Sequence, residues 1–242
     1  MEMRSETAGS DILLLTCEHA GNRIPREYAG LFARAAEVLE SHRGWDPGAL
    51  PLARSLARVF RRPLLSTPWS RLLVEANRSI SNPRIWSCYT RGLERREREK
   101  ILERYWWPHR RAVEEAVEEL IAGGRRVVHV GVHSFTPQLG GEVRNADMAL
   151  LYDSRRKAEA GFCRRWLDAL GGLEPGLRLR VNYPYLGRAD GLTTGLRRKH
   201  GEGWYLGVEL EMNQAVYGGA GWGRFQRQVA ESLRGVLAGG GG

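Results

Sequence analysis

Histidine and carboxylate side chains come at the ends of several apolar runs in this sequence. His19 lies shortly after the apolar run 12–16, and His133 directly follows the run 127–132. Glu211 directly follows a third run of the same kind, residues 205–210. Runs of this length are typical of buried β-strands. Because ligands of open α/β sheets bind outside the carboxyl ends of the strands, parallel pairing would bring the three side chains to one edge.

A metal ion is the first chemistry that these residue types suggest. A catalytic zinc takes three protein ligands of the His, Asp or Glu type and keeps an open position for water. His19 and His133 are the best nitrogen ligands, and Asp46 in the segment GWDPG is the predicted oxygen ligand, because it sits beside a turn at a helix start. The alternatives are a plain helix N-cap for Asp46 and hydrogen-bonded structural roles for the histidines. Glu18 would point away from His19 on an extended strand, so it is a poorer ligand.

If the metal site belonged to a hydrolase, that hydrolase would also need a group that takes a proton from the metal-bound water and gives one to the leaving group. Glu211 suits this role, since burial at the end of an apolar strand would raise its pKa toward neutrality. Glu209 lies on the same strand face by alternation and is the rival. A structural salt bridge is the alternative for either glutamate. The sequence contains no G-x-S-x-G elbow and no Walker loop, so neither a serine nucleophile of that type nor a P-loop is indicated.

Arginine is the residue type that recognises a substrate carboxylate, because its planar fork binds the two oxygens together. Arg78 is the favoured candidate, since it follows the run 72–75, predicted as a strand, and precedes a turn-rich segment. The chain is rich in arginine, and the other candidates are Arg144, Arg188, Arg197 and Arg198.

The remaining histidines are less suited to a metal site. His129 lies inside a predicted strand, four residues before His133, an offset that suits a helix rather than a strand, so we interpret it as structural. His109 opens a helical stretch and is also interpreted as structural. His42 and His200 lie in polar loops.

Short apolar runs alternate with helical patterns along the chain. The sequence predicts further strands at 148–152 and 177–181, and helices at 25–40, 46–60, 93–122, 157–170 and 222–237. No internal repeat or linker interrupts this order. We therefore expect one domain over residues 1–242, of the α/β class, with a mostly parallel or mixed central sheet flanked by helices.

Composition narrows the class of protein. The 242 residues are 42% hydrophobic and 27% charged, which excludes disordered, collagen-like and membrane proteins. No apolar run approaches the about 18 residues that span a bilayer. The acidic start of the chain does not resemble a secretory signal, and three widely spaced cysteines favour a reducing compartment. A cytoplasmic location is predicted.

The formal net charge of +9 raises the question of nucleic acid. The basic residues are scattered, and the densest cluster, at 91–100, carries glutamates at helical spacings. That pattern favours a solvated helix face over a phosphate-binding stripe. A small anionic substrate explains the positive charge equally well, so no nucleic-acid partner is predicted.

An ordered set of short segments runs from Cys17 to Tyr217. They are residues 17–25 (CEHAGNRIP), 44–48 (GWDPG), 75–78 (EANR), 132–135 (VHSF), 182–185 (NYPY), 190–191 (DG), 211–214 (EMNQ) and Tyr217. Taken together in this order, these segments resemble the N-formylglutamate amidohydrolase family.

The resemblance implies a phosphorylase/hydrolase-like fold similar to that of zinc carboxypeptidases. It implies one zinc ion, or another divalent metal, held by the residues at positions 19, 46 and 133, with Glu211 as acid and base. The expected reaction is hydrolysis of N-formylglutamate to formate and glutamate, as in histidine degradation, by a monomer or small homo-oligomer. Arg78 would bind the substrate carboxylate. The further substrate-binding residues expected on this basis are Asn77, Ser134, Arg144 and Tyr185.

Two positions depart from the family pattern. Gln214 stands where many relatives have arginine, and the segment 77–79 lacks the acidic continuation. The acyl group and the amino acid side chain therefore stay open. A zinc-dependent peptidase or cell-wall amidase on the same scaffold is one alternative, and a non-enzymatic basic binder of acidic ligands or RNA, free of metal, is another.

Overall fold

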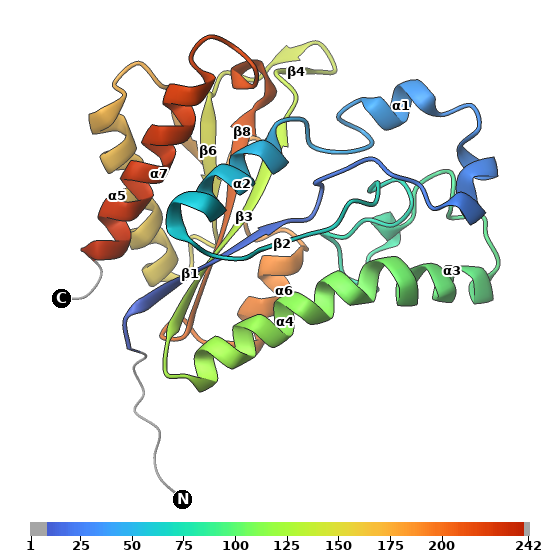
Figure 1. The fold of residues 1–242 in the computed structure, drawn as a ribbon, viewed down its shortest axis with the longest axis horizontal. Coiled ribbons are helices and arrows are strands. Elements are labelled where there is room, and N and C mark those ends of the chain that lie inside the picture. Colours follow the sequence, from blue (N-terminus) through green and yellow to red (C-terminus); the bar gives the residue numbers. More distant parts are fainter. Residues whose placement is uncertain (1–8, 240–242) are drawn as a thin grey trace, which may run out of the picture.

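A computed structural model describes residues 9–239, so the acidic start of the chain and the last three glycines lie outside the described residues. The central sheet has six strands in the order β2-β1-β3-β8-β6-β7 (Figure 1). The strands are β1 (Asp11–Cys17), β2 (Leu64–Ser66), β3 (Arg126–Phe135), β6 (Met148–Leu151), β7 (Leu179–Val181) and β8 (Tyr205–Asn213). Four of them, β2, β1, β3 and β8, are parallel, and β6 runs antiparallel to β8. The predicted single α/β domain with a mixed sheet is confirmed.

Helices cover both faces of the sheet, which explains why its strands are continuous apolar runs (Figure 1). On one face, Leu13 and Leu15 pack with α2 (Ala49–Phe60), α5 (Lys157–Leu173) and α7 (Trp222–Ala238). On the other face, Ile12 and Leu14 pack with residues of α4 (Trp107–Ala122) and α6 (Leu192–Lys199). Full burial of each such side chain contributes about 1.5–3 kcal/mol.

Several segments between β1 and α4, apart from α2 and β2, form a third, mainly aromatic and aliphatic cluster beside the sheet. It includes η1 (Arg26–Phe32), α1 (Ala36–Glu40), η2 (Pro83–Ile85), α3 (Arg95–Ile101) and the π-helical turn η3 (Leu102–Trp106). The predicted helix at 25–40 is therefore a 3₁₀-helix and a short α-helix. The predicted strand at 72–75 is wrong: residues 71–73 form a turn, and Leu72, Leu73 and Val74 are buried in this cluster.

The carboxyl ends of β3 and β8 continue into short elements that rim the same edge of the sheet. The hairpin of β4 (Gln138–Leu139) and β5 (Glu142–Val143) follows β3, and the 3₁₀-helix η4 (Gln214–Val216) follows β8. Elements from distant parts of the chain thus meet at this edge.

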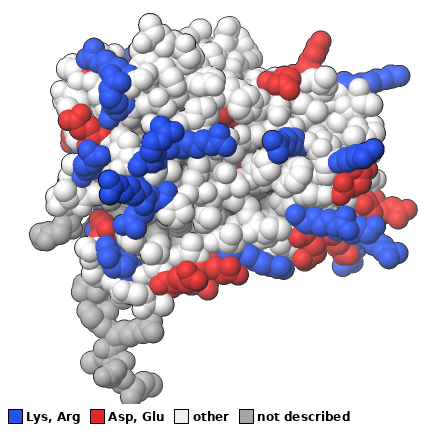
Figure 2. Space-filling view, viewed as in Figure 1, with Lys and Arg blue, Asp and Glu red and all other residues white. Residues whose placement is uncertain are grey.

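Basic and acidic side chains lie close together at the α3 end of the face drawn in Figure 2. On α3, Arg95 pairs with Glu99 and Lys100 with Glu97. The segment 91–100 is therefore the solvated, salt-bridged face that its spacing predicted. Among the described residues, no helix combines the length and apolar character that a membrane crossing requires.

Candidate metal centre

Three elements bring His19, Asp46 and His133 together at the carboxyl edge of the sheet. His19 lies just beyond β1, His133 lies near the end of β3, and Asp46 precedes α2. The Asp46 N–H donates to the His19 carbonyl at 3.0 Å, and the Ser134 N–H donates to Asp46 Oδ2 at 3.3 Å. All three side chains are buried. The residues predicted from strand ends and the helix start are thus neighbours in space.

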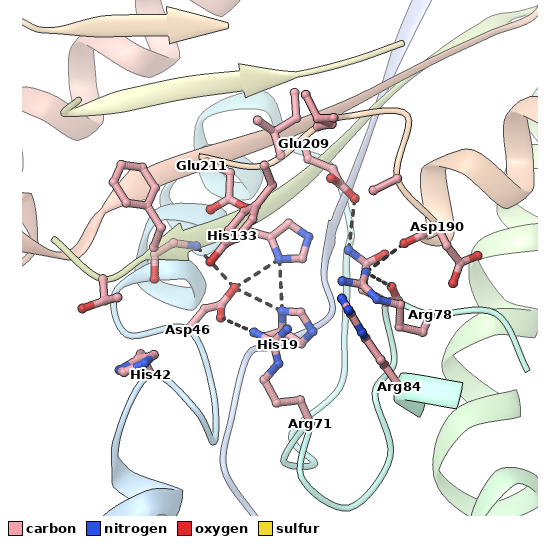
Figure 3. Close-up of a pocket in the computed structure, with 18 residues that line it drawn as sticks. His19, His42, Asp46, Arg71, Arg78, Arg84, His133, Asp190, Glu209 and Glu211 are labelled. Atoms are coloured by element: carbon pink, nitrogen blue, oxygen red, sulfur yellow. Dashed lines mark hydrogen bonds and ion pairs between the residues drawn. The ribbon is translucent and has the colours of Figure 1, made fainter. Parts of the chain in front are cut away.

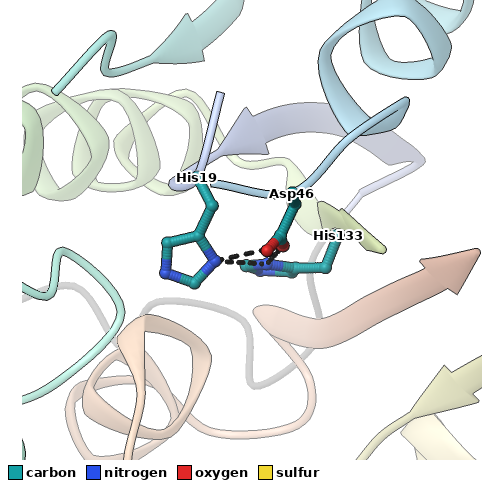
Figure 4. A group of neighbouring side chains, drawn as sticks. All are labelled: His19, Asp46 and His133. Atoms are coloured by element: carbon teal, nitrogen blue, oxygen red, sulfur yellow. Dashed lines mark hydrogen bonds and ion pairs between the residues drawn. The ribbon is translucent and has the colours of Figure 1, made fainter. Parts of the chain in front are cut away.

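The geometry of these three side chains suits a single cation (Figure 4). His19 Nδ1 and His133 Nδ1 each lie 3.1 Å from Asp46 Oδ2, and the two nitrogens lie 3.2 Å apart. Ligand atoms of a tetrahedral zinc, with bonds of about 2.0–2.1 Å, are separated by about 3.3 Å. The group could therefore hold a divalent metal.

Asp46 does not cap the helix that follows it. Helix α2 begins at Ala49 behind Gly48, which has φ of 83°, and no side chain caps it. A Cβ at Gly48 would lie 2.6 Å from the Met212 side chain and 2.7 Å from that of Tyr217. Glycine at 48 thus permits the left-handed turn and the close approach of β8 that aim the carboxylate of Asp46 at the histidines.

A second layer of carboxylates faces the outer nitrogen of each histidine. His19 Nε2 is hydrogen-bonded to Glu75 Oε1, and His133 Nε2 lies 3.0 Å from Glu18 Oε2. Because an ionised carboxylate only accepts, each pair favours an N–H on Nε2, so that Nδ1 would be the ligand atom once a cation replaces a proton between Nδ1 and Asp46. This is the arrangement that orients histidine ligands in metal sites. Glu18 is not in the ligand group, as expected, but it has this outer role.

Arg71 balances the charge around the centre. Its Nη1 lies 3.2 Å from Asp46 Oδ1 and its Nη2 lies 2.7 Å from Glu75 Oε2. Burial alone would raise the pKa of Glu75, but Arg71 and His19 hold that pKa well below its usual range. Sequence reasoning gave neither residue a role, although Glu75 begins the segment EANR. Their opposite charges at i and i+4 were a further local signal, but that spacing is ordinary on solvated helices.

A cavity of about 380 Å³ opens beside the His–Asp–His group (Figure 3). Of the residues predicted to bind substrate, Asn77, Arg78, Ser134 and Tyr185 line it. Arg144 does not line the cavity, but its Nη1 donates to the Tyr185 hydroxyl at 3.2 Å. The cavity wall also contains residues that sequence reasoning left out or placed elsewhere, namely His42, Arg71, Arg84, Leu186 and Asp190.

The other candidate arginines lie elsewhere. Arg188, Arg197 and Arg198 line a separate pocket. Arg197 is buried and pairs with Glu159 at 2.9 Å.

Glu211 and Glu209 both line the cavity but differ in their bonding. Glu211 is opposite His133 in the register of the parallel strands β3 and β8, and 5% of it is exposed. Its Oε2 has no hydrogen-bond partner among the described residues. Burial, with the nearby carboxylates of Asp46 and Glu209, raises the pKa of Glu211 to about 8. Glu209 Oε1, in contrast, accepts from Asn77 Nδ2 at 3.0 Å.

The fold and the site define an α/β protein with a buried His–Asp–His group and a cavity at the carboxyl ends of its parallel strands. The sequence model of one family, described as N-formylglutamate amidohydrolase, matches residues 12–218. The chain belongs to the N-formylglutamate amidohydrolase family, a family of hydrolases.

Two solved structures are similar to this chain over nearly their whole length. A gene product from Agrobacterium tumefaciens is 30% identical, with a TM-score of 0.78 over 96% of this chain and 92% of that one. The N-formylglutamate amidohydrolase from Ralstonia eutropha is 20% identical, with a TM-score of 0.68 over 96% of each chain, and at that identity it supports the fold alone. No curated protein matches.

Replacement of either histidine by alanine is expected to abolish the binding of a divalent metal without unfolding the protein. His19→Ala or His133→Ala leaves two of three ligands, which is too few to hold a divalent ion through dialysis. Metal content by mass spectrometry, with circular dichroism for the fold, measures this. His200→Ala, a histidine outside the cavity, is the matched control. Full metal occupancy in both ligand variants would contradict the site.

Glu75→Gln is expected to weaken zinc affinity by about 10–100-fold, the usual effect of losing an outer carboxylate behind a histidine ligand. Competition with a chromogenic chelator measures the affinity, and Glu103→Gln on the exposed face of η3 is the control. An unchanged affinity would mean that Glu75 does not orient His19.

Proposed function

We propose that this protein is a metal-dependent amidohydrolase that cleaves the amide bond of a small N-formyl amino acid such as N-formylglutamate. The products are formate and the free amino acid. The observation that carries the proposal is one cavity lined by the His–Asp–His group, by Glu211 and by Arg78. The family of the chain supports the substrate class.

Zinc is the proposed metal, one ion per chain held by His19, Asp46 and His133. Two imidazoles and a carboxylate are a donor set that zinc accepts, although another divalent metal would also fit. A cation bound there supplies Lewis acidity toward the amide carbonyl and lowers the pKa of water.

Glu211 is the proposed acid and base. It takes a proton from the attacking water and returns it to the departing amide nitrogen. Its free Oε2 and its place opposite His133 support this role over Glu209, whose carboxylate is already engaged by Asn77. A carboxyl group with a pKa of about 8 is poised near neutrality, and a bound cation beside it would shift the pKa downward.

Arg78 is the proposed ligand of the substrate α-carboxylate. Its Nη1 donates to the carbonyls of Asn77 and Asp190, at 2.8 Å each. These bonds fix the guanidinium plane and leave its other donors for an anion in the cavity. Asn77, Ser134 and Tyr185 are proposed to contact the substrate around it, with Arg144 acting through Tyr185.

We further propose that the chain acts as one domain on a small anionic substrate in the cytoplasm, as a monomer or small homo-oligomer. A cavity of about 380 Å³ has the size of a site for a small molecule. Turnover of a panel of N-formyl and N-acetyl amino acids by zinc-loaded protein tests the function. Formate release that chelation abolishes is expected. Cleavage of peptides alone would favour the peptidase reading, and a protein that binds no metal would favour a non-enzymatic binder.

Glu211→Gln is expected to keep the metal and lose at least about a hundredfold in turnover, the scale of a positioned acid and base. The glutamine has nearly the same shape but cannot carry the proton. Steady-state kinetics together with metal content measure this. A larger loss in Glu209→Gln than in Glu211→Gln would transfer the role to Glu209.

Arg78→Lys is expected to raise KM substantially while zinc content stays normal, because lysine keeps the charge but loses the fork. The increase should be much smaller for substrates whose α-carboxylate is an amide. Kinetics on paired acid and amide substrates measure this. Equal losses on both would show that Arg78 has a structural role.

A further inference from the structure

Arg84 is a second arginine on the wall of the cavity, and neither the strand pattern nor the motifs pointed to it. It lies in η2, and its side chain extends from that turn toward the end of the cavity where Arg78 lies (Figure 3). Arg84 is exposed at the cavity mouth. Within residues 9–239, neither Arg78 nor Arg84 forms an ion pair with a carboxylate: the arginine pairs are made by other residues, among them Arg71.

The backbone that carries both arginines is tied to one residue of the opposite wall. The carboxylate of Asp190 accepts from the Ser79 N–H at 2.9 Å and from Asn82 Nδ2 at 2.7 Å. Asn82 Oδ1 in turn accepts from the Arg84 N–H at 2.9 Å. The carboxylate of Asp190 thus holds the loop in place and accepts no hydrogen bond from either guanidinium group, and only the backbone carbonyl of Asp190 accepts from Arg78. The turn is fixed while the Arg84 side chain stays free to reach a ligand.

The arginines around the cavity differ in their partners. Arg71 lies between the carboxylates of Asp46 and Glu75. Arg78 and Arg84 also face the cavity (Figure 3), and two of the acidic side chains that line it are engaged by other groups: Asp190 by the loop and Glu209 by Asn77. Two adjacent cations without carboxylate partners suit a ligand that carries two negative groups.

We propose that Arg84 determines specificity by binding the side-chain carboxylate of an acidic N-formyl amino acid, while Arg78 binds its α-carboxylate. This inference rests on the proposed function and deepens it. It assigns to Arg84 the discrimination between an acidic and a neutral side chain of the substrate. The two arginines have different roles. Arg78 is held by backbone carbonyls and positions the amino acid, whereas Arg84 binds the distal carboxylate.

The test compares N-formyl-L-glutamate with N-formyl-L-glutamine, which differ only in the charge of the side chain. With zinc-loaded protein, Arg84→Gln is expected to raise KM for the glutamate substrate about tenfold or more, since a charge-assisted pair is lost. KM for the glutamine substrate should change less than about twofold. Arg84→Lys, which keeps the charge, should recover part of the preference for glutamate. Arg96→Gln, an exposed arginine of α3 outside the cavity, is the matched control for loss of one positive charge.

The possible outcomes distinguish a failure of the Arg84 assignment from a failure of the proposed amidohydrolase function. A loss confined to the glutamate substrate supports the assignment of Arg84. Equal losses on both substrates, or no loss on either, overturn that assignment and leave the proposed function standing. If wild-type protein loaded with zinc turns over neither substrate, the proposed function itself fails and the assignment of Arg84 fails with it.

Discussion

The centre of this protein depends on the close approach of three electron-rich atoms in a buried place. The two imidazole Nδ1 atoms and one Asp46 oxygen lie within 3.2 Å of one another, and their side chains are almost fully buried. Such a cluster is unfavourable unless positive charge lies among its members. In the protein alone, protons supply it: the nearby carboxylates raise the pKa of His19 and hold that of His133 well above its usual value, although burial acts in the opposite direction. A divalent cation would take the place of those protons, so metal binding would release them.

The sheet provides the rigid part of this arrangement. His133 and Glu211 are paired across the parallel strands β3 and β8, and the register repeats two residues earlier with Gly131 and Glu209. At Gly131 a side chain would lie against Thr16, Glu18 and the ring of His133. The outer carboxylate of Glu18 and the ring of His133 thus lie close to the backbone of β3 at this position. His133 is thus set by the backbone hydrogen bonds of the sheet, whereas His19 and Asp46 lie in turns that a backbone hydrogen bond joins to each other.

The contrast between residues placed by the sheet and residues placed by loops explains which site residues the sequence could predict. Strand ends in a parallel sheet are recognisable from apolar runs, so His19, His133 and Glu211 could be named in advance. The roles of Arg71, Glu75 and Arg84 could not, because the loop between β2 and α3 packs against η1 and η3, which are distant from it in sequence. The apolar run 72–75 illustrates the difficulty. Periodicity cannot distinguish a buried strand from a turn whose apolar side chains fill a separate cluster.

His129 and His133 show what separates a structural histidine from one suited to bind a metal. Both lie on β3, both are buried, and they face the same side of the strand. The nitrogens of His129 are hydrogen-bonded to the hydroxyls of Thr16, at 2.8 Å, and Tyr205, at 2.7 Å, and burial lowers its pKa to about 4. A neutral ring with both nitrogens occupied has no lone pair to offer. His133 meets a carboxylate at each nitrogen, so its environment favours positive charge on or beside the ring. The hydrogen-bond and ion-pair partners of a histidine, and not its burial or its strand position, therefore decide whether it can bind a cation.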